Sequence, residues 1–150
     1  MVIRRYSEAW DEKIYKLFWR AVHISNKEFY TEAELDAWAP SSADPSQWCR
    51  GLLNATSLLA VEGDELLGFG SAVSDYIDRL YVDPDHQGRG IGKLLLKSLE
   101  GGRDDEFHTY ASKQARRFFE RQGYIVEMEH HAFRRGQTLL NYLMVKPHYE

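Results

Sequence analysis

The stretch from Tyr76 to Glu100 constrains the fold of this chain more than any other. It reads Y-I-D-R-L-Y-V-D-P-D-H-Q-G-R-G-I-G-K-L-L-L-K-S-L-E, which predicts a buried strand, a turn with a proline, a glycine-rich loop and an amphipathic helix. Gly88, Gly90 and Gly92 permit a tight turn and let a ligand come close to the backbone. Because a helix N-terminus presents unpaired N–H groups, the sequence predicts an anion site here, with a phosphate as its natural occupant.

Composition limits which phosphate compound that is. The net charge is −4 at pH 7, and nucleic-acid binding needs a basic surface, so no nucleic-acid partner is expected. The 150 residues are enough for one domain, 1–150, with a core that needs neither disulfide nor metal. Cys49 is the only cysteine, which excludes an internal disulfide and a cysteine-based zinc cluster. Without a signal peptide or membrane-spanning stretch, a soluble cytoplasmic protein with no membrane partner is expected.

Apolar periodicity predicts a helical first third followed by a sheet. Helices are expected over 11–24, from 31 to 40, from 44 to 53, from Gly90 onward and around 115–122. Strands are expected over 2–6, 57–62, 66–74, 76–82, 107–111, 124–128 and 139–145. A helix lies between 76–82 and 107–111, so a right-handed crossover would make these two strands parallel neighbours.

The residues of the glycine loop resemble a known signature. Gln87-x-x-Gly90-x-Gly92, between a strand and a leucine-rich helix, resembles the acetyl-CoA motif of the GNAT superfamily, the GCN5-related N-acetyltransferases. A-R-R-F-F-E-R-Q-G-Y, residues 115–124, resembles the second motif of that family. The segment F-Y-T-x-x-x-L-x-A-W-A, residues 29–39, and the closing L-N-Y-L-M-V-K-P resemble the YafP-type subgroup. The resemblance implies an α/β fold: a mixed, mainly antiparallel sheet of about seven strands, flanked by helices, with a splayed central strand at the cofactor site.

The resemblance also implies an enzyme. A GNAT protein would move acetyl from acetyl-CoA to an amine by direct attack in a ternary complex, without a metal. A small-molecule amine is favoured, because nothing in the chain resembles a peptide-docking extension. Two alternatives stay open: an N-acetyltransferase acting on proteins or peptides, and an acyl-CoA-binding sensor without turnover. A plain nucleotide-phosphate binder fits less well, since G-x-x-x-x-G-K-[ST] is missing. The oligomeric state is open, and a homodimer is among the choices.

The family pattern assigns residues to the cofactor. These positions are Leu80, Tyr81, Val82, Gln87, Gly88, Arg89, Gly90, Ile91, Gly92, Lys93, Ser112, Phe118 and Phe119. The loop backbone would wrap the pyrophosphate, with side-chain charge from Arg89 and Lys93 near the nucleotide. The strand end would pair with the pantetheine arm, and a backbone N–H there would polarise the thioester carbonyl.

Two positions depart from the family pattern. Phe119 stands where the family often has a tyrosine that protonates the leaving thiolate, and Ser112 replaces a common asparagine. A thiolate can leave at neutral pH without an enzymic acid; otherwise Tyr110 and Tyr142 are the candidate proton donors.

The acceptor side has fewer candidates. Asp78 is a candidate general base, because it lies two residues before Leu80 and is expected on the same strand face. The alternative is an Asp78 that binds a loop or the ammonium of the acceptor without taking its proton. Tyr76, two residues earlier, would share that face. Tyr30 and Trp38 either line the acceptor pocket or belong to the core.

Other aromatic and histidine residues have simpler interpretations. Trp48 is expected in the core. Of His130 and His131, at most one can face the cleft, because adjacent strand residues point to opposite faces, and a surface pair is the simpler expectation.

Overall fold

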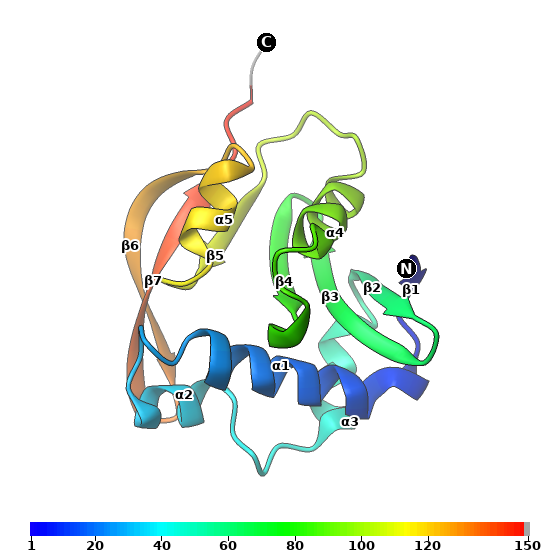
Figure 1. The fold of residues 1–150 in the computed structure, drawn as a ribbon. Helices are drawn as coiled ribbons and strands as arrows, with labels where there is room; N and C mark the ends of the chain where they lie inside the picture. Colours follow the sequence, from blue (N-terminus) through cyan, green and yellow to red (C-terminus); the bar gives the residue numbers. More distant parts are fainter. Residues whose placement is uncertain (149–150) are drawn as a thin grey trace.

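Seven strands form one mixed sheet in the computed structural model, which describes residues 1–148 (Figure 1). The strands are β1 Val2–Arg5, β2 Thr56–Glu62, β3 Glu65–Val73, β4 Tyr76–Val82, β5 His108–Ala111, β6 Ile125–Arg134 and β7 Gln137–Val145. Their order is β1-β2-β3-β4-β5-β7-β6, and only the β4–β5 pair is parallel. The predicted mixed, mainly antiparallel sheet flanked by helices is confirmed.

Helices cover both faces of this sheet. They are α1 Asp11–Ser25, α2 Glu32–Trp38, α3 Pro45–Trp48, α4 Ile91–Glu100 and α5 Arg116–Arg121, with 3-10 turns η1 Glu8–Trp10, η2 Cys49–Leu52 and η3 Pro84–His86. In Figure 1, α4 lies against the β1–β4 half, α5 against the β5–β7–β6 half, and α1 runs across the end of both. None of the helices in residues 1–148 is both long and apolar enough to cross a membrane.

Local sequence signals account for where the first helices begin. Thr31 and Glu34, whose spacing is that of a capping box, form one: the Glu34 N–H donates to Thr31 Oγ1 at 3.1 Å, and the Thr31 N–H donates to Glu34 Oε1 at 2.8 Å. The Asp44 side chain accepts the N–H of Ser46 at 2.9 Å at the start of α3.

Strand β6 is longer than the sequence predicts. It continues to Arg134 instead of ending near residue 128, because it forms a hairpin with β7 through the two-residue turn Arg135–Gly136. Both turn residues have positive φ, 43° and 82°, as a type I′ turn requires. Arginine is an unusual residue at the first of these positions.

Helix α4 is held close to β3 by two glycines. A Cβ on Gly68 would lie 3.1 Å from Leu95 Cδ1, and one on Gly70 would lie 2.9 Å from Leu99 Cδ1. The buried face of α4 carries Ile91, Leu95, Leu96 and Leu99, whereas Leu94 is 40% exposed. The position of the helix start is therefore set by contact with the sheet.

Strands β4 and β5 pair only where they begin. Their ladder has the single residue pair Tyr76–His108, and the His108 N–H and Thr109 Oγ1 donate to the carbonyls of Asp75 and Ile77 at 2.9 and 2.8 Å. Beyond this point the strands diverge, as Figure 1 shows. The β5-facing backbone edge of residues 80–82 has no ladder partner within residues 1–148.

A buried carboxylate joins the two halves of the sheet at the closed end. Glu100, at the end of α4, has 5% of its side chain exposed and accepts the Tyr124 hydroxyl at 2.8 Å. The ammonium of Lys146, after β7, lies 3.2 Å from both Glu100 oxygens. A buried charge is tolerated because it is both paired and hydrogen-bonded.

Replacing the tyrosine of this cluster tests its contribution to stability. Tyr124→Phe keeps the buried ring and removes one donor to a charged acceptor, so we expect the free energy of unfolding to fall by about 1.5–3 kcal/mol. Urea denaturation measures the change. Tyr110→Phe, at a tyrosine that is 42% exposed, is the matched control and should change stability by less than about 0.5 kcal/mol. Equal effects of the two substitutions would contradict a structural role for the Glu100 cluster.

Candidate active site

The divergence of β4 and β5 opens two cavities that meet. The larger, of about 330 Å³, lies on the side of α2 and the β6–β7 hairpin, and the smaller, of about 100 Å³, lies between the end of β4 and α5. Tyr81 and Ser112 line both of them. We call these the acceptor cavity and the cofactor cavity.

The cofactor cavity brings together most of the residues that the resemblance assigns to acetyl-CoA. It is lined by Ala21, Ser25, Asn26, Leu80, Tyr81, Val82, Gln87, Gly92, Ser112, Gln114, Ala115, Phe118 and Phe119. One wall is the unpaired end of β4, and the other is the start of α5. The cavity is therefore a slot with a free strand edge along it.

The glycine loop lies at the mouth of this slot. Gly88 and Gly90 have φ of +79° and +78°, and Gly90 is the N-cap of α4 without a side-chain cap. The first N–H groups of α4 therefore remain available to an anion. Gly92 has another role, since a Cβ there would lie 3.2 Å from the Phe118 ring.

Four of the predicted cofactor residues are either exposed at the surface or packed in the core. Arg89 and Lys93 are exposed, and the Arg89 guanidinium lies 3.4 Å from Glu62 Oε2. Ile91 is 1% exposed and its side chain belongs to the core, so this residue offers only its backbone to a ligand. Phe119 is 4% exposed and packs on Tyr124, which accounts for the apolar residue at that position.

Asn26 is a cofactor-cavity residue that sequence reasoning missed. It follows α1 and is 3% exposed; its Nδ2 donates to the Ala21 carbonyl at 3.2 Å. Its Oδ1 is buried and has no hydrogen-bond partner among the described residues. The amide cannot flip without placing Oδ1 against the Ala21 carbonyl, so the unpaired atom is an acceptor. Nothing in the motif pattern pointed to this residue.

A β-bulge corrects the expected face of Asp78. Ser71 pairs with Arg79 and Ala72 pairs with Ile77, so Asp78 is an extra residue in β4. In such a bulge the two residues opposite one partner share a sheet face, and Asp78 and Arg79 both line the acceptor cavity. Leu80 instead packs beside α4, so the expectation that Asp78 shares its face is wrong.

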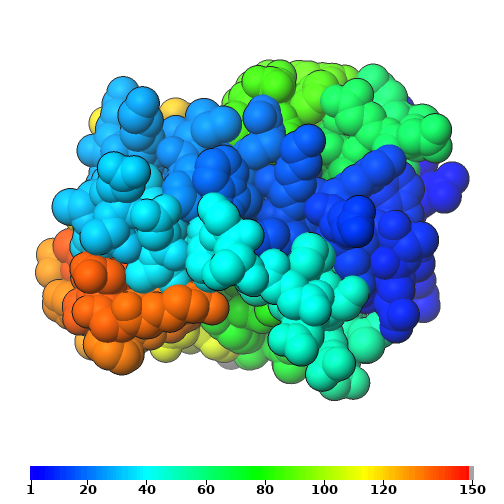
Figure 2. All heavy atoms as spheres, turned by 90° about the horizontal axis from the view of Figure 1, so that it is seen from below, coloured from blue at the N-terminus to red at the C-terminus, as the bar shows by residue number. Residues whose placement is uncertain are grey.

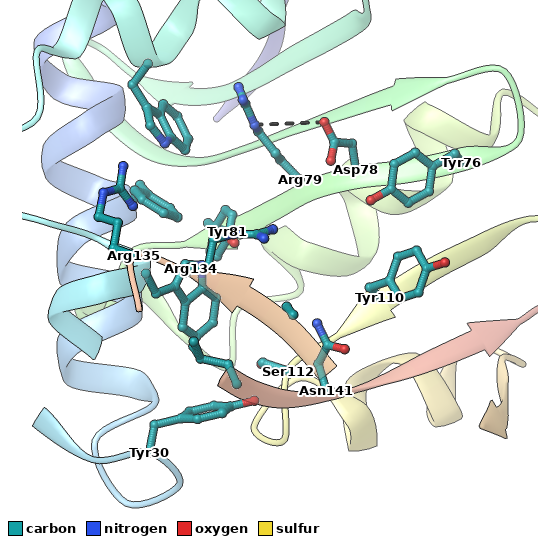
Figure 3. Close-up of a pocket in the computed structure, with 15 residues that line it drawn as sticks. Tyr30, Tyr76, Asp78, Arg79, Tyr81, Tyr110, Ser112, Arg134, Arg135 and Asn141 are labelled. Atoms are coloured by element: carbon teal, nitrogen blue, oxygen red, sulfur yellow. Dashed lines mark ion pairs between the residues drawn. The ribbon is translucent and has the colours of Figure 1, made fainter. Parts of the chain in front are cut away.

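Aromatic rings from several elements form the acceptor cavity wall. The lining comprises Phe18, Tyr30, Trp38, Trp48, Tyr76, Asp78, Arg79, Tyr81, Tyr110, Ser112, Ala132, Arg134, Arg135, Leu139 and Asn141 (Figure 3). Tyr30, Trp38 and Tyr76 are all in this set. Tyr30 also links two other segments, because its hydroxyl donates to the Leu140 carbonyl at 2.6 Å and accepts the Lys113 N–H at 3.1 Å. Trp48 lines the cavity as well as packing on Phe18, with ring centroids 4.3 Å apart.

The hydroxyls of Tyr76 and Tyr30 remain protonated at neutral pH. Burial first, and then the neighbouring Asp78, raises the pKa of Tyr76 to about 12. Burial raises the pKa of Tyr30 to about 12 as well. Neither hydroxyl can act as a base at neutral pH. The carboxylate in the lining of the acceptor cavity is that of Asp78.

The two tyrosines considered as proton donors lie on opposite faces of the sheet. Tyr110 lines the acceptor cavity, and its ring centroid lies 6.1 Å from that of Tyr76. Tyr142 lines neither cavity and has the Arg116 guanidinium 4.7 Å above its ring. Ser112 lies where the cavities meet and accepts the Ala115 N–H at 3.1 Å, so its own O–H is free to donate.

Of the histidine pair, His130 is on the acceptor side. Its Nδ1 lies 2.8 Å from Asn141 Oδ1, and its ring centroid lies 4.4 Å from that of Tyr110. His131 is exposed. This contact joins His130 to the Asn141 amide at the edge of the cavity.

Comparison with known proteins places the chain in a family. A family model for the acetyltransferase (GNAT) domain matches residues 26–146. The chain is 32% identical over 142 residues to the uncharacterised N-acetyltransferase YafP of Escherichia coli K12, covering 95% of this chain and 93% of that one.

Solved structures show the same fold. A GCN5-related N-acetyltransferase from Rhodopseudomonas palustris is 29% identical and superposes with a TM-score of 0.91, covering 97% of this chain and 94% of that one. YncA from Salmonella typhimurium, a putative acetyltransferase solved with its cofactor acetyl-CoA, is 21% identical with a TM-score of 0.70, covering 100% and 95%. The chain therefore belongs to the GNAT acetyltransferase family, and it is an acyltransferase.

Proposed function

We propose that this chain, as a single domain over residues 1–150, transfers the acetyl group of acetyl-CoA directly to the amine of a small molecule in a ternary complex. The observation that carries the proposal is the meeting of the two cavities at Tyr81 and Ser112. A donor in one cavity and an amine in the other would face each other there, and positioning alone supplies a large part of acyl-transfer catalysis.

The cofactor cavity suits the shape and polarity of acetyl-CoA. The N–H groups at the start of α4 would bind the pyrophosphate, and YncA, which shares this fold, was solved with its cofactor acetyl-CoA. The free edge of residues 80–82 would pair with the pantetheine arm, as a further strand would. The unpaired Asn26 Oδ1 would accept an amide N–H of that arm, which satisfies an otherwise orphaned buried acceptor.

The chemistry needs two proton movements. The amine nitrogen forms a bond to the carbonyl carbon and loses a proton, while the C–S bond breaks and the sulfur gains one. Asp78 is the proposed acceptor of the amine proton, and Ser112, at the junction, is placed to donate a hydrogen bond to the sulfur. Tyr110, which lines the acceptor cavity, is the alternative proton donor. Tyr142 is disfavoured as a donor because it lies on the other face of the sheet.

The enclosure of the acceptor cavity favours a small molecule over a polypeptide. The Arg135 guanidinium donates to the Ala37 carbonyl at 2.7 Å and fastens the β6–β7 turn to α2. Figure 2 shows this turn, in orange, beside the cyan segment that contains α2. An extended peptide would need a continuous groove at this place, and the contact closes it.

The glycine loop can be tested with a matched pair of substitutions. Gly90→Val forces a β-branched residue into φ +78° and should disturb the phosphate loop, so we expect the Kd for CoA to rise more than about tenfold. Gly63→Val places the same residue at φ +61° in the β2–β3 turn, with similar strain and no cofactor contact. Isothermal titration measures both. If both proteins bind CoA with the same affinity, the loop assignment is wrong.

Asn26 can be tested with two ligands. Asn26→Leu removes the proposed pantetheine acceptor, so the Kd for CoA should rise about five- to tenfold. Adenosine 3′,5′-bisphosphate lacks the pantetheine arm, and its Kd should stay within about twofold. Equal weakening of both ligands would instead indicate a general disturbance of the cavity, and no change in either would remove Asn26 from the site.

Asp78→Asn separates a base from an ammonium ligand. Loss of a general base should lower kcat about a hundredfold or more, with the Kd for CoA unchanged. If Asp78 only binds the ammonium group, KM for the acceptor rises and kcat holds. Release of the CoA thiol gives both constants, and Asp64→Asn, in the β2–β3 turn, is the control. Unchanged kcat and KM would remove Asp78 from the mechanism.

A further inference from the structure

The charge of the acceptor cavity is unusual for a site that takes an amine. Its lining has three guanidinium groups, on Arg79, Arg134 and Arg135, and one carboxylate, on Asp78. A cation alone would be repelled by this set. An acceptor that brings an anionic group as well as its amine would complement it.

Of the three arginines in the cavity lining, Arg79 makes the fewest hydrogen bonds within the described residues. Its Nη1 is buried and has no hydrogen-bond partner among residues 1–148. The Asp78 carboxylate lies 4.0 Å from Nε, beyond hydrogen-bond distance, and about 20% of the Arg79 side chain is exposed. Because the guanidinium is only partly solvated and its ion pair with Asp78 is long, an anion at its exposed edge would be attracted to it.

Neighbouring residues hold the Arg79 guanidinium in place without accepting a hydrogen bond from it. Its guanidinium carbon lies 4.2 Å from the centroid of the Trp48 ring, and a Cβ on Gly51 would lie 2.9 Å from Nη2. The ring of Trp48 and the close approach of Gly51 restrict the position of the guanidinium. A fixed planar fork of N–H donors can bind two oxygens of an oxyanion at once, and a carboxylate is one group that offers them.

The two arginines of the β6–β7 turn retain free donors. Arg134 donates through Nη1 to the Phe133 carbonyl at 2.9 Å, and Arg135 donates through Nη1 to the Ala37 carbonyl at 2.7 Å. Each guanidinium has five N–H groups, so each has others left for a ligand. Arg135 holds φ +43°, where glycine or asparagine would be less strained, and its side chain is then delivered to the cavity.

The charged side chains and the tyrosines lie in different parts of the acceptor cavity. Figure 3 shows Arg134 and Arg135 at one end, Tyr76 and Tyr110 at the other, and Asp78 beside Arg79 between them. A molecule with a carboxylate at one end and an amine at the other therefore has a complementary group for each end. The aromatic rings of Trp38 and Trp48 form the apolar wall alongside.

We propose that the acceptor is a small amino acid in the broad sense, an amine that also carries a carboxylate, and that Arg79 binds this carboxylate together with the arginines of the β6–β7 turn. The inference rests on the proposed function, because it names the acceptor class of the same site. The volume of about 330 Å³ limits the acceptor to a small molecule.

Matched ligand pairs test the inference separately from the function. Phenylalanine and phenylalaninamide, 4-aminophenylacetate and 4-aminophenylacetamide, and 4-aminobutyrate and 4-aminobutyramide differ in each pair by the carboxylate. Binding to the CoA-loaded protein is measured by isothermal titration, and acetyl transfer by thiol release from acetyl-CoA. In at least one pair the acid should bind about tenfold or more tightly than its amide.

Two variants assign that preference to the arginines. Arg79→Gln should reduce the preference for the acid to about twofold or less while leaving amide binding unchanged. Arg135→Gly relieves the positive φ, so weaker acid binding in this variant cannot be attributed to a strained turn. Arg117→Gln, at an exposed position on α5 outside both cavities, should keep the full preference.

The outcomes distinguish the two proposals. Amides that bind as tightly as acids in every pair overturn the carboxylate inference, whether or not acetyl is transferred. An acid preference that survives both Arg79→Gln and Arg135→Gly overturns the role of these arginines. An arginine-dependent preference without any acetyl transfer supports the anion site and overturns the proposed function instead.

Discussion

The short parallel pairing of β4 with β5 is the constraint on which the rest of the structure depends. One ladder pair, Tyr76–His108, holds the two strands together, and the divergence beyond it produces both cavities. A strand edge released in the middle of a sheet would normally be a liability, because its backbone groups lose their partners. In this fold the loss is confined to the end of β4, and it is the place where an extended ligand can pair. The buried Glu100 cluster and the hydrogen bond from the Tyr30 hydroxyl to the Leu140 carbonyl of β7 then keep the two halves of the sheet from separating further.

The bulge at Asp78 gives β4 a second use. Without the bulge, every second residue of β4 would face α4 along the whole strand. Asp78 would then lie on the same face as Leu80, covered by the helix. The extra residue instead puts Asp78 beside Arg79 on the open side, while Leu80 keeps its place against α4. One strand thus supplies a packed layer, a free backbone edge and a pair of opposite charges. Bulges are frequent next to active sites because they re-aim side chains in this way.

Prediction from sequence succeeded where the signal was local. The capping box at Thr31, the glycine loop before α4 and the parallel placement of β5 follow from short patterns and chain order, and the structure has each of them. The prediction of the sheet face of Asp78 was wrong because a bulge depends on how two strands pair. The alternation of residues along one strand does not reveal it. Arg79 and Asn26 had no signal for a similar reason. Their roles come from unpaired atoms in surroundings built by distant segments.

The two halves of the site differ in how they are built, and this explains why one is easier to read than the other. The donor half relies on backbone groups and on glycines that keep side chains away, so its chemistry is common to any chain with this loop. The acceptor half is made of side chains from α1, α2, α3, β4, β5 and the β6–β7 hairpin, each of which is free to vary without disturbing the loop. The hairpin is joined to the helical side of the cavity at two places, by Arg135 to the Ala37 carbonyl and by the Leu140 carbonyl to the Tyr30 hydroxyl. The identity of the acceptor should therefore be set largely by the residues that this hairpin and Arg79 present to the cavity.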